Sequence, residues 1–244
     1  KSMITSSNSI NFAYILYLKL KDSKYDPAKI ESLVRKWFVL SILTGRYSSS
    51  AESAFDYDIR NMAEDYEKYI NTTISAELSD SFWEIGLIEN LKRSVVSNPF
   101  INVFFASQVK ENNKGFLSTD ITVRDMIIHR GDIHHIFPKA YLRTKYNSRN
   151  DYNQIANYVY MQSEINIQVG KKSPEEYFGE IINQIKTGDI KYGGITDMGT
   201  LSDNLSQHCI PESIFSMTLD NYFDFLDQRR KLIAQKIKKY YQEL

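Results

Sequence analysis

Apolar residues recur at the three- and four-residue spacing of an amphipathic helix along most of the chain, which predicts a largely helical protein. Proline and helix-capping residues mark where several of these segments begin, and glycine marks where some of them end. The helices expected in the first 119 residues span residues 8–21, Pro27 to Gly45, Ser50 or Ser53 to about Ile70, Ser79 to Leu91, and a short apolar segment from Pro99.

The pattern changes between residues 120 and 186, where two short stretches resemble β-strands. Residues 131–137 are followed by Pro138, and residues 157–161 are rich in β-branched and aromatic side chains. After them we expect helices from Ser163 to Gly170, from Ser173 to about Lys186 and from Thr218 to Leu244, with a loose Gly- and Asp-rich loop over residues 187–204.

These segments predict a mainly α protein in three parts. Residues 1–119 form a helical region, and residues 120–186 form a small core that contains both strands and carries the chemistry. Residues 187–244 form a C-terminal loop and a long helix, which we expect to pack on the helical region.

The net charge, the cysteine count and the lengths of the apolar runs limit the partners and the cellular compartment that we expect. The chain has 30 Lys plus Arg and 30 Asp plus Glu, so any nucleic-acid binding depends on local patches rather than on net charge. The single cysteine, Cys209, excludes a disulfide framework and a cysteine-based zinc site, which fits a reducing compartment. No apolar run reaches the length of a membrane span and no signal peptide is visible, so we expect a cytoplasmic protein without a membrane partner. The first residue is Lys, and we therefore expect a fragment of a longer protein or a processed product.

The residues most suited to catalysis lie in and after the first predicted strand. Alternation along a strand places His135 on one face and His134, with Asp132, on the other, so one histidine can bind a metal while the other acts as a base. His135 suits the base because imidazole titrates near neutral pH. Downstream, Asn157 offers an amide oxygen of the kind that Mg²⁺ or Mn²⁺ accepts, and Asn166 follows nine residues later.

Asp132 to Lys139 (DIHHIFPK), Asn157 to Tyr160 (NYVY), Asn166 and Lys171 to Tyr177 (KKSPEEY) together resemble the HNH (ββα-metal) nuclease module at the C-terminal end of GmrSD-type modification-dependent restriction endonucleases. Residues 37–49 and 55–60 resemble the helical middle region of that family. The resemblance runs from about residue 12 to residue 180, and it implies a multi-helix domain with a small embedded ββα-metal core.

The resemblance also implies a role for each candidate residue. His135 matches the general base, while Asn157 and Asn166 match the second and third positions of the catalytic set. His134 and Asn157 match metal ligands, and Asp132 is a further ligand or a partner that fixes the His134 tautomer. The metal position before the base is more often Asp or Glu, so the imidazole of His134 can shift preference from Mg²⁺ or Mn²⁺ toward Ni²⁺ or Zn²⁺.

The function implied is a metal-dependent DNA endonuclease of a phage-defence restriction system, acting on modified DNA and leaving 5′ phosphate and 3′ hydroxyl ends. Lys139, Arg143, Lys171 and Lys172 are the expected phosphate contacts. In the resembled family an N-terminal domain hydrolyses nucleotide, and we expect this missing part as a partner. No phosphate-binding glycine loop occurs in the chain, so we expect no nucleotide site within it.

Two alternatives stay open. The departure at His134 and the neutral net charge are compatible with a DNA-binding or regulatory module whose nuclease site is degenerate. An HNH nuclease that acts on RNA differs only in its substrate, which the sequence does not specify.

Overall fold

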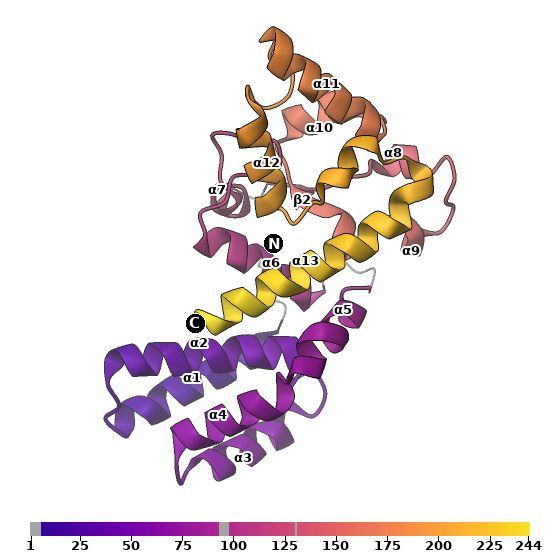
Figure 1. Ribbon diagram of the computed structural model, residues 1–244. Coiled ribbons are helices and arrows are strands. Elements are labelled where there is room, and N and C mark those ends of the chain that lie inside the picture. Colours follow the sequence, from indigo (N-terminus) through magenta and orange to yellow (C-terminus); the bar gives the residue numbers. More distant parts are fainter. Residues whose placement is uncertain (1–5, 93–97, 130) are drawn as a thin grey trace. The chain divides into compact units, whose positions relative to one another are not determined.

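The computed structural model describes residues 6–92, 98–129 and 131–244, and these residues are predominantly helical, as predicted (Figure 1). They form two compact units. The smaller unit contains the described residues up to Asn90 together with Ile237–Leu244, and the larger unit contains those of Leu91–Lys236.

The smaller unit is helical throughout its described part. Helix α2 begins at Pro27, where the Asp26 side chain accepts hydrogen bonds from the amides of the first turn. It ends at Gly45, whose φ of +64° is the left-handed conformation that glycine adopts without strain. Helix α1 packs on α2, and α4 packs on both α2 and α3. The elements are α1 (Ser7–Asp22), α2 (Pro27–Thr44), α3 (Ala51–Met62), α4 (Tyr66–Glu77), a π-helical turn η1 (Phe82–Gly86) and α5 (Leu87–Asn90).

The single helix predicted from residue 50 to residue 70 is wrong, because the chain breaks between α3 and α4. Asp65 supplies the reason: its backbone is extended and its carboxylate accepts a hydrogen bond from the amide of Lys68, which starts a new helix. The helix predicted from Ser79 is confirmed: it runs continuously from Asp80 to Asn90, with π-helical hydrogen bonding over η1 before α5.

The larger unit holds the two predicted strands. They pair antiparallel, with Ile133 opposite Tyr160, His134 opposite Val159 and His135 opposite Tyr158. Both strands are shorter than predicted. The elements are α6 (Pro99–Lys110), α7 (Val123–Ile128), β1 (Ile133–His135), α8 (Lys139–Leu142), α9 (Arg149–Tyr152), η2 (Ile155–Asn157), β2 (Tyr158–Tyr160), α10 (Ser163–Val169), α11 (Pro174–Thr187), α12 (Met198–Gln207), η3 (Glu212–Ser216), η4 (Leu219–Asn221) and α13 (Tyr222–Gln242), whose last residues belong to the smaller unit.

The loose loop predicted over residues 187–204 is wrong at its C-terminal end, where α12 begins. The Asp197 carboxylate accepts a hydrogen bond from the amide of Thr200 and so caps this helix. Leu201 and Leu205, four residues apart, are buried on its inner face. Burial of these two side chains outweighs the poor helix propensity of the Gly- and Asp-containing sequence.

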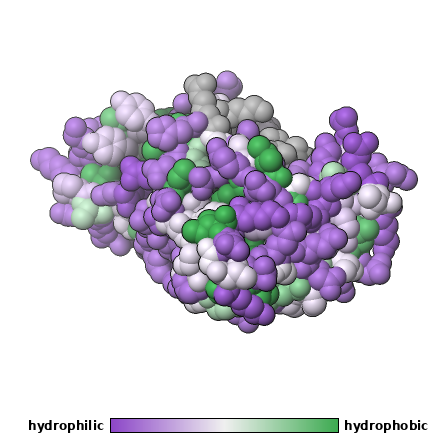
Figure 2. All heavy atoms as spheres, turned by 90° about the horizontal axis from the view of Figure 1, so that it is seen from above, coloured by the Kyte–Doolittle hydropathy of each residue, from purple (hydrophilic) through white to green (hydrophobic). Residues whose placement is uncertain are grey.

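Charged and polar side chains dominate the face of the molecule in Figure 2, where hydrophobic side chains are exposed in scattered places. Among the helices within the described ranges, none is both long and apolar enough to cross a membrane.

Candidate functional site

His135 lies on β1 against the second strand. Its ring contacts the ring of its cross-strand neighbour Tyr158 edge to face, with 5.0 Å between centroids. Its Nε2 lies 3.3 Å from the Oδ1 of Asn153. An amide oxygen only accepts hydrogen bonds, so Nε2 donates and Nδ1 of the neutral ring keeps its lone pair. Burial lowers the pKa of His135 to about 4, more than the hydrogen bond with Asn153 raises it, and the ring is therefore neutral at pH 7.

His134 lies opposite Val159, one position along the strand from the His135–Tyr158 pair, so the two histidines point to opposite faces as alternation predicts. Its Nε2 is buried and has no hydrogen-bond partner among the described residues. Burial lowers the pKa of His134, and the negative charge of the exposed Asp132 opposes this effect. Asp132 is therefore close enough to His134 to act on it electrostatically.

Asn157 is fully buried at the end of η2, immediately before β2. Its Oδ1 accepts a hydrogen bond from the amide of Phe137 at 2.8 Å, and its Nδ2 donates to the carbonyl of Phe137 at 3.0 Å. Its own carbonyl accepts from the amide of Ile136. In this conformation Asn157 braces the chain just after His135, and its amide oxygen is already used within the protein.

Asn166 lies on α10, the helix that follows β2, and its side chain is partly exposed. Its backbone carries the hydrogen bonds of the helix, while its side chain has no hydrogen-bond partner within the described part of the chain. The contacts described above join His134 to Asp132 and His135 to Asn153. No such contact joins Asn166 to either histidine.

Three of the four cations expected to touch phosphate are exposed: Lys139, Arg143 and Lys171. Lys139 belongs to the histidine region, since its charge contributes to lowering the pKa of His135, and its Nζ lies 5.3 Å from the ring centroid of Tyr152.

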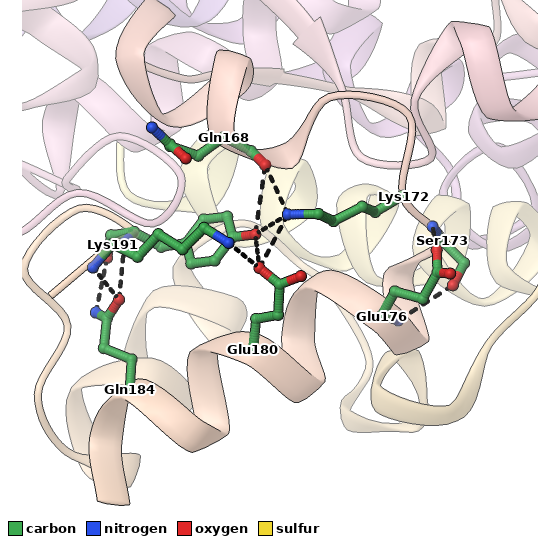
Figure 3. A network of polar contacts seen from close by, with 8 residues as sticks. Gln168, Lys172, Ser173, Glu176, Glu180, Gln184 and Lys191 are labelled. Atoms are coloured by element: carbon green, nitrogen blue, oxygen red, sulfur yellow. Dashed lines mark hydrogen bonds and ion pairs between the residues drawn. The ribbon is translucent and has the colours of Figure 1, made fainter. Parts of the chain in front are cut away.

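Lys172 has different surroundings, because it belongs to a polar network that ties Gln168 of α10 to Glu180 of α11 (Figure 3) and that also includes Tyr192. Its Nζ donates to the carbonyl of Gln168, to Oε2 of Glu180 and to the hydroxyl of Tyr192, at 3.0, 2.9 and 2.7 Å. Burial would raise the pKa of Glu180, but hydrogen bonds from Lys191, Tyr192 and Lys172 lower it to about 2. The structure thus gives Lys172 a bracing role here, which the sequence did not reveal.

The sequence also did not reveal Asn153. It lies in a polar stretch, residues 147–153, whose composition indicates only a loop, and nothing in that stretch distinguishes Asn153 from its neighbours. Its contact with His135 depends on how this loop folds back on the strand. In the described ranges, no three side chains from the set His, Cys, Asp and Glu form a group able to hold a metal ion.

Comparisons with known proteins give little beyond this geometry. The chain is 26% identical over 224 residues to the uncharacterized protein MJ0686 of Methanocaldococcus jannaschii, a match that covers 84% of this chain and 36% of that protein. The chain thus spans about a third of the relative's length. No family model matches the chain, and no solved structure matches it.

Proposed function

We propose that this chain is a metal-dependent DNA endonuclease of the HNH type, in which β1, β2 and α10 form a ββα-metal core. The observation that carries the proposal is the brace between Asn157 and Phe137. It joins two motif segments twenty residues apart and fixes the backbone directly after the neutral, partly buried His135. A strand pair held in this way presents a base in a defined position, which general base catalysis requires.

In the proposed reaction, His135 accepts a proton from water at Nδ1 as the water oxygen bonds to phosphorus. The bond between phosphorus and the 3′ oxygen breaks, and the leaving 3′ oxygen takes a proton from a solvent water molecule, which leaves a 5′ phosphate and a 3′ hydroxyl. Asn153 keeps Nε2 hydrogen-bonded and so orients the ring with Nδ1 free. The exposed Lys139 and Arg143 supply positive charge for the phosphate backbone close to this strand.

Two residues that precede His135 in the chain, Asp132 and His134, carry donor groups suited to a divalent cation. His134 offers a buried imidazole nitrogen to which no described residue hydrogen-bonds, and Asp132 offers a carboxylate close enough to act on it electrostatically. Asn166 offers an amide oxygen on the following helix, at a position that no contact among the described residues links to His134. Oδ1 of Asn157 is fully buried and accepts a hydrogen bond from the amide of Phe137. We therefore assign the ligands to His134 and Asp132, and we assign the bracing role to Asn157. A bound cation would act as a Lewis acid on the phosphate.

Cleavage of supercoiled plasmid in Mg²⁺ or Mn²⁺, with and without EDTA, tests the proposal. We expect nicked and linear products that EDTA prevents, and we expect His135→Ala to lose cleavage. His129→Ala, which changes an exposed histidine outside the strand, is the matched control and should cleave like the wild type. Equal cleavage by the wild type and His135→Ala would refute the assignment.

The same assay separates the alternatives. A binding module with a degenerate site would retain salt-dependent DNA binding without any metal-dependent product. Cleavage of RNA but not of DNA would support a nuclease that has the same site and acts on a different substrate. Plasmid and phage DNA with and without modified bases would then test the restriction role that the resemblance implies.

A further inference from the structure

Arg229, on α13, is a fully buried cation. It is 0% exposed, and no carboxylate of the described residues forms an ion pair with it. Its guanidinium donates only to backbone carbonyls: Nε and Nη2 to His208 at 3.1 and 3.0 Å, and Nη1 to Ala156 and Tyr158 at 2.7 and 3.0 Å. Burial lowers the pKa of Arg229 to about 10, so the group stays charged at neutral pH.

The two carbonyls that share Nη1 flank Asn157. Ala156 precedes Asn157 in η2, and Tyr158 follows it as the first residue of β2. Arg229 therefore fixes the carbonyls of the residues immediately before and after Asn157, the residue that braces Phe137. A continuous set of hydrogen bonds runs from α13 through residues 156–158 to the chain next to His135.

An arginine suits this position for a geometric reason. Its planar fork can hold three carbonyls from one rigid group, whereas lysine has a single ammonium on a flexible stem. Burying a charge costs several kcal/mol, which an apolar side chain of similar size would avoid. The need to fill space next to α13 therefore does not explain why residue 229 is arginine. The need to fix the orientation of several carbonyls does explain it.

We propose that Arg229 is a positioning residue for the site: it sets the backbone at residues 156–158 and, through Asn157, the placement of Phe137 and His135. The effect on catalysis rests on the proposed nuclease function. The effect on the backbone does not, so the two can fail separately.

Arg229→Lys tests the proposal, because it keeps the charge and removes the fork. Lys236→Met is the matched control: Lys236 is another largely buried cation of α13, but its Nζ bonds to Glu111, Asn113 and the carbonyl of Gln207 and does not reach β2. In Arg229→Lys we expect hydrogen exchange of the Phe137 amide to be at least about tenfold faster. In Lys236→Met we expect it to match the wild type.

Plasmid cleavage provides the second readout. Displacing a base by about 1 Å can cost on the order of a hundredfold in rate. We expect kcat of Arg229→Lys to fall about 10- to 100-fold while KM for DNA stays within about twofold. In a double-mutant cycle with Asn157→Ala, the two losses should be less than additive, since both act on the same brace.

Three results would overturn the proposal. Unchanged exchange at Phe137 in Arg229→Lys would show that the fork does not hold the brace. An equal loss of Phe137 protection in Lys236→Met would show a general effect of α13. Should Arg229→Lys fail to fold, Arg229→Gln is the second variant, and failure of both to fold would show a role in folding alone. If the wild type does not cleave DNA, that result counts against the proposed nuclease function only. Hydrogen exchange of the Phe137 amide then still tests whether Arg229 positions the backbone.

Discussion

The side chain of Asn157 forms two hydrogen bonds with the backbone of Phe137, one to its amide and one to its carbonyl. Both residues are fully buried, so water cannot replace these bonds. The contact fixes the start of β2 against the end of β1, and it is the reason why Asn157 is better explained as a brace than as a metal ligand.

Replacing Asn157 by Ala should destabilise the larger unit strongly. The substitution leaves the amide and the carbonyl of Phe137 buried without partners, at a cost of about 2 to 5 kcal/mol in the free energy of unfolding. Urea denaturation followed by circular dichroism measures it. Asn183→Ala, which changes an exposed residue of α11, should stay within about 0.5 kcal/mol of the wild type. Equal losses in the two variants would contradict the brace.

Neighbouring lysines at positions 171 and 172 should respond differently to substitution by Ala. If the chain binds DNA as proposed, Lys171→Ala should weaken binding and reduce the slope of log K against log salt by about 0.9, because an exposed phosphate contact is lost. Lys172→Ala should instead lower the melting temperature, because it removes three hydrogen bonds from the network around Glu180. Salt titrations by fluorescence anisotropy, paired with thermal melts, measure both effects. The reverse assignment of the two effects would be inconsistent with the structure.

Stability should fall as the pH falls below 6.5, in part because of His208. This residue is fully buried; its Nε2 donates to the carbonyl of Lys114 and its Nδ1 accepts from Gln108. Burial lowers its pKa to about 3, so below pH 6.5 the unfolded chain binds a proton that the folded chain does not. The loss that His208 contributes between pH 6.5 and 5 is about 2 kcal/mol.

Chemical denaturation at several pH values measures this dependence. His208→Gln should show a flatter profile between pH 6.5 and 5, although its stability at neutral pH is lower because the ring's packing against Phe116 is lost. His129→Gln changes an exposed histidine and should keep the wild-type slope. An unchanged slope in His208→Gln would refute the prediction.

The smaller unit depends on a buried carboxylate at Asp58. Arg46 donates to both of its oxygens, and the hydroxyls of Tyr47 and Tyr69 donate to it at 2.7 and 2.8 Å. Asp58→Ala leaves the largely buried guanidinium of Arg46 with Glu77 as its remaining carboxylate partner and removes the acceptor of both tyrosine hydroxyls, which should cost about 2 to 4 kcal/mol in the free energy of unfolding. Asp56→Ala, on the exposed face of the same helix, should cost less than about 0.5 kcal/mol. Similar unfolding midpoints for the two variants would count against this network.

Two glycines of the larger unit should give opposite results when replaced by Ala. At Gly193, where φ is +54°, an added Cβ would lie 1.8 Å from the carbonyl oxygen of Leu117, so the variant should be destabilised by several kcal/mol or fail to fold. At Gly179, within α11, nothing lies within 4 Å of an added Cβ. Gly179→Ala should therefore raise stability by up to about 1 kcal/mol. Thermal melts of both variants provide the comparison, and a tolerated Gly193→Ala would show that this loop can move away from Leu117.

The sequence by itself determined the helical class, most helix starts and stops, and the separation of His134 from His135. These features depend on near neighbours: Pro27 and Gly45 delimit a helix locally, and strand alternation acts on adjacent residues. The break at Asp65 was missed even though its cause is local, because an acidic residue is as common on an exposed helix face as at a cap.

Only the tertiary structure decided which polar side chains already have hydrogen-bond partners within the protein. Asn157 forms a hydrogen bond with Phe137, Lys172 with Glu180, and His135 with Asn153. The partners in these pairs are 8 to 20 residues apart in the sequence. Arg229 reaches carbonyls more than seventy residues away. Sequence spacing does not encode these pairings, because a hydrogen bond forms between whichever groups the packed core brings within about 3 Å.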